Sequence, residues 1–269
     1  MRAPDPAAVL LVVGAAALYW RAVRTLRGRG FEVPRAQRAA WAGGLALVAL
    51  GLIGPIDAWS EELLSAHMAQ HLLIADLAAP LLLAGLRTPV LQFFLPPPVL
   101  VPLARRRGLR RAFAVLRRPL VAVPLWVVIL YGWHLELAFE AALTSPVLHA
   151  LQHESFVVGS VLVWWAAVEP TRRRLRGELW KIGHILGARL AGMFLGMALI
   201  ALRSPLYAPL YDGGFGLSAR HDQQLAGALM LGLDTLVMLA ALGFFFVRAA
   251  QDHDRAEAAA REIQPVARG

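Results

Sequence analysis

Residues 65–86 spell SAHMAQHLLIADLAAPLLLAGL, an apolar run with two histidines near its start and one aspartate near its middle. About 20 apolar residues cross the hydrocarbon core of a bilayer, so this run predicts a transmembrane helix. The chain holds six further runs of the same kind, at 7–23, 40–56, 119–138, 147–168, 183–202 and 224–247. The sequence therefore predicts an all-α, polytopic membrane helix bundle of about seven transmembrane helices.

The composition favours a membrane protein over a large soluble domain. Of the 269 residues, 58% are hydrophobic and 17% are charged, whereas soluble domains are about 45–50% apolar and about 25% charged. Cysteine is absent, which excludes disulfides and thiolate metal sites. The first apolar run has its arginines after it, which is the reverse of a cleaved signal peptide. We expect that run to be the first transmembrane helix.

The charges between the apolar runs predict the orientation. Arginines cluster after the first, third and fifth runs, whereas Asp57, Glu61 and Glu62 follow the second run without a basic residue. Cytoplasmic loops carry the Lys and Arg excess, so the amino terminus is expected outside and the carboxyl terminus inside. The net charge of +9 then reflects orientation, and no nucleic-acid recognition module is visible. Residues 1–248 form the predicted transmembrane domain, and 249–269 form a polar cytoplasmic tail that we expect to be partly disordered.

Most of the histidines fall at the outer ends of the predicted helices. They are His67, His71, His134, His149, His153 and His221. The sequences HMAQH and HALQH each place two imidazoles four residues apart, on one helix face. Neutral imidazole binds copper, zinc, iron and nickel. A single interfacial histidine is more commonly a headgroup-level residue, but two pairs on one rim favour a metal site, with Asp222 as a further ligand.

Other polar and sulfur-containing residues lie close to this rim or deeper in the membrane. Met68 lies between the first two histidines, and Met230, Asp76 and Asp234 fall within apolar runs. Ionisable residues within a span are costly and commonly functional, so the two acids either pair helices, with Arg189 as a candidate partner, or serve ion transit. On an α-helix Asp76 lies about 140° around from His71 and would not share its face. A GxxxG pattern at Gly192 and Gly196 suggests close helix packing.

Several short motifs together resemble the CtaG family of cytochrome c oxidase assembly factors, in its seven-span membrane form. They are HMAQH followed by AAPLLLAG, then YGWH, LHALQHESFVVGSVLVWW and HDQQLAGALM. The resemblance implies a role in forming haem–copper oxidase, with copper handling by His67, His71, His134, His149 and His153. It also implies a functional pair at Asp222 and Gln223. The chain departs from the family pattern at Glu136, Ala166 and Leu231.

The combined hypothesis is a plasma-membrane assembly factor, not an enzyme, that binds copper at an outward-facing histidine cluster and passes it to cytochrome c oxidase subunits. Zinc and haem stay open as alternatives to copper. A haem-binding redox protein would show a Soret band, whereas a copper transporter would use Asp76, Asp234 and Met230 as a path inward. A scaffold would function without its histidines. The lipid bilayer is the expected surrounding partner, and a homo-oligomer stays open.

Overall fold

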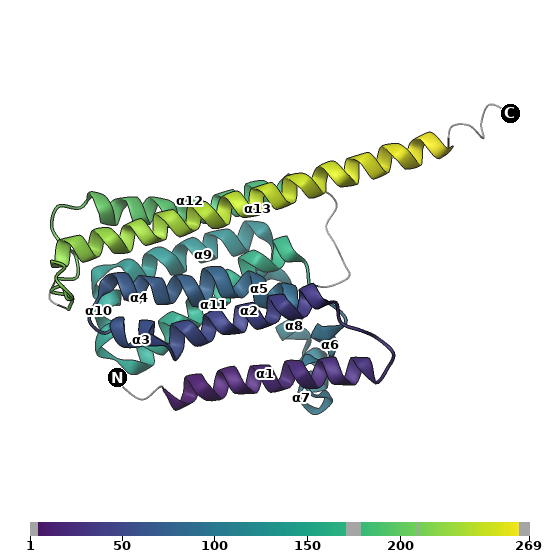
Figure 1. Ribbon diagram of the computed structural model, residues 1–269, viewed down its shortest axis with the longest axis horizontal. Coiled ribbons are helices and arrows are strands. Elements are labelled where there is room, and N and C mark those ends of the chain that lie inside the picture. Colours follow the sequence, from purple (N-terminus) through teal and green to yellow (C-terminus); the bar gives the residue numbers. More distant parts are fainter. Residues whose placement is uncertain (1–4, 171–178, 209, 264–269) are drawn as a thin grey trace.

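The computed structural model describes residues 5–170, 179–208 and 210–263, and all regular structure within these ranges is helical. The long helices run side by side along one axis (Figure 1). They are α1 (Pro6–Arg27), α2 (Arg35–Leu52), α9 (Pro119–His134), α11 (Pro146–Val168), α12 (Leu179–Ala201) and α13 (Ala219–Ile263). The third apolar run forms three consecutive segments, α4 (Leu64–His71), the π-helix η1 (Leu72–Leu77) and α5 (Ala78–Gly85). The predicted all-α class is confirmed.

Five stretches within the described ranges are long and apolar enough to cross a membrane. They are Pro6–Arg27, Arg35–Trp59, Leu64–Gly85, Leu179–Ala201 and Ala219–Ala258. A sixth arises if α8 (Arg107–Leu116) and α9, which are bent by 80° relative to each other, form one span. Helix α11 has the length of a span, but the polar side chains around His149 and His153 make it less apolar. The chain is thus a multi-pass membrane protein with five to six spans by length and composition.

Short helices fill the connections between the long ones. They are α3 (Pro55–Trp59), α6 (Val90–Phe94), α7 (Pro97–Arg105), α8 and α10 (Glu136–Thr144). Leu95 and Pro96 separate α6 from α7, and Pro97 begins α7, where the missing N–H removes no intrahelical bond. The predicted fourth helix, 119–138, is corrected, because α9 ends at His134 and Leu135 is extended before α10 begins.

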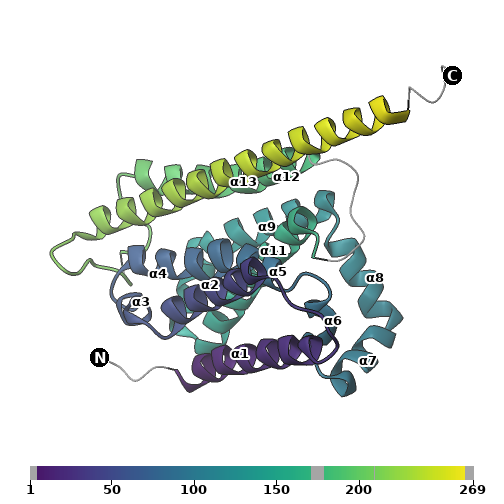
Figure 2. The ribbon, with the colours of Figure 1, turned by 45° about the vertical axis from the view of Figure 1, so that its right-hand side comes forward.

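Helices α12 and α13 form a closely packed hairpin along one side of the bundle (Figures 1 and 2). A Cβ atom added to Gly196 would lie 2.7 Å from the carbonyl oxygen of Gly227, and one added to Gly227 would lie 2.5 Å from that of Gly196. Both distances are too short for a side chain, so the helices meet backbone to backbone. The close packing predicted from Gly192 and Gly196 is confirmed.

Helix α13 continues past the other helices and runs to Ile263 (Figure 1). The tail after residue 248, predicted to be partly disordered, is helical as far as Ile263, and residues 250–258 are exposed as a solvated tail would be. The division of the chain at residue 248 stays a prediction.

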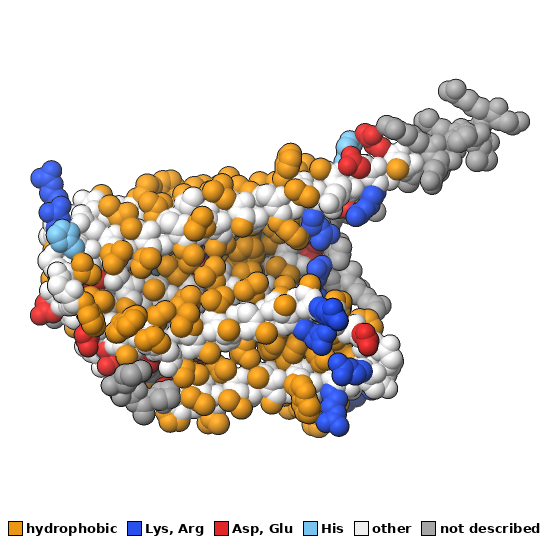
Figure 3. All heavy atoms as spheres, viewed as in Figure 1, with side chains coloured by type: hydrophobic (Ala, Val, Ile, Leu, Met, Phe, Trp, Pro, Cys, Tyr) orange, Lys and Arg blue, Asp and Glu red, His pale blue; other side chains and the backbone are white. Residues whose placement is uncertain are grey.

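Charge is distributed unevenly between the two ends of the bundle. Figure 3 shows Lys and Arg side chains gathered mainly at the end from which α13 projects, whereas acidic side chains lie at both ends of the visible face. The surface between the ends is largely hydrophobic. Helix α1 begins at the end opposite the basic one, and α13 terminates beyond the basic end (Figure 1).

Candidate metal centre

The two histidine pairs come from α4 and α11 and face each other inside the bundle. The rings of His67 and His149 are stacked with centroids 5.3 Å apart, and those of His71 and His153 lie edge to face at 4.9 Å. Within each helix the paired rings are 4.4 Å and 4.3 Å apart. The predicted convergence of the two pairs is therefore present in the structure, and we call these four residues the histidine cluster.

The ring nitrogens of this region are buried without hydrogen-bond partners in the described part of the chain. The atoms are Nε2 of His67, both nitrogens of His71, and Nε2 of His134, His149 and His153. Burying a polar atom without a partner costs free energy, and native proteins rarely leave several together. Each neutral imidazole has a lone pair on one ring nitrogen, and a metal ion would bond to it, so the donor set fits a metal.

A tyrosine fixes the tautomer of one histidine. Tyr211 has one hydroxyl hydrogen, which it donates to the Ser60 carbonyl oxygen at 2.8 Å. The contact of 3.2 Å between Tyr211 Oη and His67 Nδ1 must then use a hydrogen on Nδ1. Burial raises the pKa of the Tyr211 hydroxyl above its ordinary value, so the hydroxyl stays neutral. Nε2 of His67 is left with its lone pair available, as a metal ligand requires.

His134 is oriented in the same way. Its Nδ1 lies 2.7 Å from the Leu130 carbonyl oxygen, which can only accept, so Nδ1 carries the hydrogen. Its Nε2 again retains a lone pair and is buried without a partner among the described residues. Hydrogen bonds at Nδ1 therefore hold His67 and His134 in the tautomer that leaves Nε2 available to a metal.

The distances in the cluster approach those of a coordinated ion. The ligand nitrogens of His67, His71 and His149 all lie within 4.8 Å of one another. These three described residues could therefore hold a metal ion together. Metal–nitrogen bonds of about 2.0–2.1 Å place two opposite ligands at most about 4.2 Å apart. Side-chain rotations that shorten the longest separation by about 0.6 Å would therefore close the site.

A small cavity joins the cluster to residues deeper in the membrane. It measures about 20 Å³, which is room for about one water molecule. His71, His134, Met68, Met230 and both buried acids contribute to its lining. The cavity brings the predicted supporting residues Met68 and Met230 to the inner side of the cluster.

The placement of Asp76 corrects the expectation that it lies away from the histidine face. That expectation assumed 3.6 residues per turn, but the chain between His71 and Asp76 is the π-helix η1, whose hydrogen bonds reach five residues back. Each turn therefore holds more residues, and Asp76 returns to the side of His71. Both residues line the same small cavity.

The two buried acids share one arginine. Nη1 of Arg189 donates to Asp76 Oδ1 and to Asp234 Oδ1, the second contact being 2.6 Å long. The arginine is 1% exposed, and Gly192 leaves the space that the Asp234 carboxylate occupies. Of the two roles considered for these acids, helix pairing is the one that these contacts support. The triad ties η1 to α12 and α13.

The remaining predicted ligands lie outside the cluster. Both carboxylate oxygens of Asp222 accept backbone N–H groups at the start of α4, from Leu64 at 2.7 Å and Ser65 at 3.0 Å. Gln223 accepts from the Leu206 amide and donates to the Leu199 carbonyl oxygen. These contacts give Asp222 and Gln223 structural roles.

His221 points away from the bundle. It is exposed, and its Nδ1 lies 3.1 Å from Ser218 Oγ. The structure does not bring it to the other histidines.

Sequence inspection missed the aromatic residues that enclose the cluster. The Phe139 ring lies 5.4 Å from His67, and the Phe156 ring lies 4.8 Å from His71. Tyr211 lies in the connection between α12 and α13. Phe156 follows His153 by three residues, so helical spacing could have indicated it, but no local pattern marks Phe139 or Tyr211.

One comparison with known proteins finds a match over most of the chain. Residues 17–252 match the family model described as cytochrome c oxidase caa3 assembly factor. Searches of curated proteins and of solved structures found no match. The matched region includes every residue of the histidine cluster and the Arg189 triad. The chain belongs to the CtaG family of cytochrome c oxidase caa3 assembly factors.

Proposed function

We propose that this protein binds copper at the histidine cluster and passes it to cytochrome c oxidase subunits during assembly in the plasma membrane. The observation that carries the proposal is the set of buried, unpartnered imidazole nitrogens converging from α4 and α11. The family description names an assembly factor for the oxidase, which agrees with a metal-delivery role rather than catalysis.

We further infer seven spans, with the amino terminus outside. Counting α9 and α11 as spans beside the five apolar stretches gives an odd number. An odd number agrees with α1 beginning and α13 ending at opposite ends of the bundle (Figure 1). The basic end would face the cytoplasm under the positive-inside rule. The cluster then faces outward, where Glu61 and Glu62 would attract cations.

The donor atoms favour copper among the metals that imidazole binds. Met68 and Met230 line the same cavity as His71 and His134, and thioether sulfur selects copper(I) over harder ions. The packing of the rings favours an ion over haem. Ring centroids within the cluster lie 4.3 to 6.3 Å apart, which suits a small ion held between the rings and leaves little room for a macrocycle.

The test is elemental analysis with an optical spectrum of the purified protein after copper loading. We expect about one copper per chain without a Soret band, and loss of that copper in the His71→Ala/His153→Ala double variant. His221→Ala is the matched control, because this histidine is exposed and lies outside the cluster. Its copper content should equal that of the wild type.

Two outcomes would overturn the copper proposal. Copper that stays bound to the double variant would show that the histidine cluster is not the copper site. A haem band, or no bound metal after loading, would favour the redox or scaffold alternatives.

A further inference from the structure

Helix α8 lies across the basic end of the bundle rather than along it (Figure 2). Only two residues separate its last residue, Leu116, from Pro119 at the start of α9, and the two helices are bent by 80° relative to each other. Because α9 is one of the proposed spans, a helix at this angle to it runs nearly parallel to the membrane surface.

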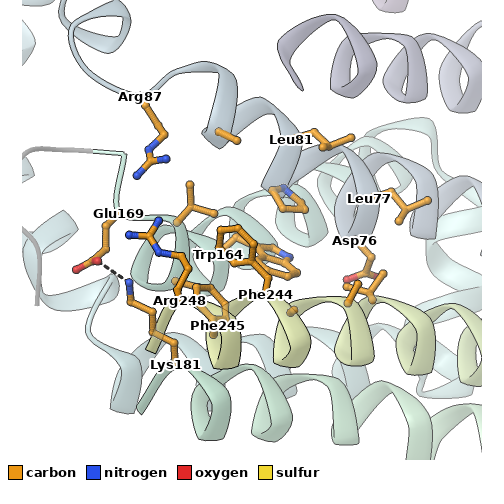
Figure 4. Close-up of a pocket in the computed structure, with 17 residues that line it drawn as sticks. Asp76, Leu77, Leu81, Arg87, Trp164, Glu169, Lys181, Phe244, Phe245 and Arg248 are labelled. Carbon is orange, nitrogen blue, oxygen red and sulfur yellow. Dashed lines mark hydrogen bonds and ion pairs between the residues drawn. The ribbon is translucent and has the colours of Figure 1, made fainter. Parts of the chain in front are cut away.

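The level of α8 along the bundle follows from one aromatic contact. The Phe113 ring lies edge to face against Trp165, near the end of α11, with ring centroids 4.9 Å apart. The neighbouring Trp164 lines a large cavity of about 460 Å³ at the basic end of the bundle. Figure 4 shows Trp164 along this cavity between Asp76 and Arg87. Tryptophan is enriched where hydrocarbon meets the lipid headgroups, so α8 lies at the depth of that boundary.

The two faces of α8 differ in chemistry. One is the basic face, formed at helical spacing by Arg107, Arg110 and Arg111. The opposite side is the apolar face, which consists of Leu109, Ala112, Phe113 and Leu116. Every residue of α8 except Phe113 is exposed, so the described part of the chain leaves most of the apolar face uncovered.

The charge of the basic face is not balanced by nearby acids. No Asp or Glu occurs in the sequence between Asp76 and Glu136. Among the described residues, no acidic side chain forms an ion pair with an arginine of the basic face. The basic face is therefore complementary to an anionic surface.

The two faces together favour a lipid leaflet over an acidic protein as the partner. A protein surface that bound the arginines would leave the apolar face on the opposite side of the helix exposed. The boundary between headgroups and acyl chains contacts both faces at once, since interfacial helices bury their apolar face about 5–10 Å into it.

We propose that α8 is an interfacial anchor that binds the anionic lipid leaflet at the basic end of the bundle. The apolar face lies among the acyl chains, and the basic face lies at the phosphates, whose oxygens the planar guanidinium bonds in pairs. The inference rests on the proposed crossing of α9 and uses none of the histidines. Failure of the copper proposal would therefore leave it unchanged.

The test of immersion uses single labels, because the chain contains no cysteine. Leu109→Cys and Arg111→Cys each carry an environment-sensitive fluorophore on the full chain, in lipid nanodiscs that contain phosphatidylglycerol. We expect the label at position 109 to emit at shorter wavelength and to be quenched by spin-labelled acyl chains. The label at position 111 should be quenched by aqueous iodide. Equal exposure of both labels to water would overturn the proposal and favour a protein partner for the apolar face.

The test of charge compares phosphatidylglycerol with phosphatidylcholine nanodiscs, using the label at position 109. Its emission should shift toward that of water in phosphatidylcholine, because the surface charge that attracts the basic face is lost. Arg107→Gln/Arg110→Gln should remove most of this difference between the two lipids. Arg35→Gln/Arg38→Gln is the matched control, because it removes the same charge from exposed positions on α2, and it should keep the difference.

Two results would overturn the preference for anionic lipid. They are equal emission of the unsubstituted labelled protein in the two lipids, and equal losses in the two double variants. Copper content and unfolding temperature equal to those of the wild type would verify that each variant is folded.

Discussion

Tyr211 controls the protonation of a candidate metal ligand through one hydroxyl group. In Tyr211→Phe, His67 loses the acceptor for its Nδ1 hydrogen, and the ring is no longer held in the tautomer that leaves Nε2 available. Loss of such an outer contact typically weakens metal binding 10- to 100-fold. We expect a weakening of this size in a copper competition titration.

Tyr207→Phe is the control for this substitution. Tyr207 is also buried and donates to the His134 backbone carbonyl oxygen at 2.7 Å, but it contacts no imidazole nitrogen in the described structure. Copper affinity should therefore change little. Equal losses in the two variants would mean that general packing, rather than the His67 tautomer, accounts for the effect.

Asp222 is expected to stabilise the start of α4 rather than to bind metal. In Asp222→Ala, the amides of Leu64 and Ser65 lose their acceptors, and loss of a capping side chain typically costs about 0.5–2 kcal/mol. Thermal unfolding in detergent should shift downward, and Asp222→Asn should recover part of the shift through its one oxygen. Copper stoichiometry should stay unchanged in both variants. Loss of copper from a folded Asp222→Asn protein would show that Asp222 is a metal ligand after all.

The predictability of the site depended on how far apart its partners lie in sequence. The histidine pairs could be recognised because residues four apart share a helix face. The partners of Asp222 and Tyr211 could not, because their contacts join residues 158 and 144 positions apart. The position of Asp222 next to His221 suggested that Asp222 is a metal ligand. Its capping role depends on the packing of α13 against α4, which the local sequence does not indicate.

At the scale of elements, the positions of the helices could be predicted from the lengths of the apolar runs. The irregularities within the helices could not. The third run was predicted as one helix, and its ends agree with Leu64–Gly85. The π-helix within it changes which side chains face the bundle, yet LLIADL has no composition that distinguishes it from ordinary α-helix. Tertiary contacts provide the reason, since Ser160 donates to the Ala75 carbonyl oxygen at 2.7 Å and Arg189 holds Asp76.

The α12–α13 hairpin should be sensitive to a single methyl group. Gly227→Ala would place its Cβ 2.5 Å from the Gly196 carbonyl oxygen, and the backbones would have to separate. Overpacking typically costs about 1–3 kcal/mol, so the unfolding temperature should fall. Gly232→Ala on the same helix is the control, because no atom lies within 4 Å of its added Cβ. It should be neutral or slightly stabilising, since alanine favours helix more than glycine does.

The orientation of the whole molecule can be tested cleanly because the chain contains no cysteine. Ser218→Cys lies in the exposed connection before α13, and Gln251→Cys lies on its exposed extension. With the amino terminus outside, a membrane-impermeant maleimide should label the first variant in intact cells and the second only after permeabilisation. The reverse pattern would place the histidine cluster on the cytoplasmic side.

The overall architecture was largely predictable because one physical requirement, burial of apolar length in lipid, determines most of it. All seven apolar runs are mainly helical in the structure, although the second and fourth runs each divide into two helices. The span count is less well determined from composition, because α11 carries His149, Gln152, His153 and Glu154. The histidines that we propose as metal ligands also make this helix less hydrophobic.

The Arg189 triad has a consequence for ion leakage across the membrane. Asp76 lines both the small cavity beside the histidines and the large cavity at the basic end, so the two cavities approach each other at this residue. A continuous water-filled path through the protein would let protons leak across the membrane and would dissipate the gradient that an oxidase maintains. At this junction Arg189 is bonded to both Asp76 and Asp234, so the three side chains fill the space between the cavities. The contacts that join three helices therefore also separate the two cavities from each other.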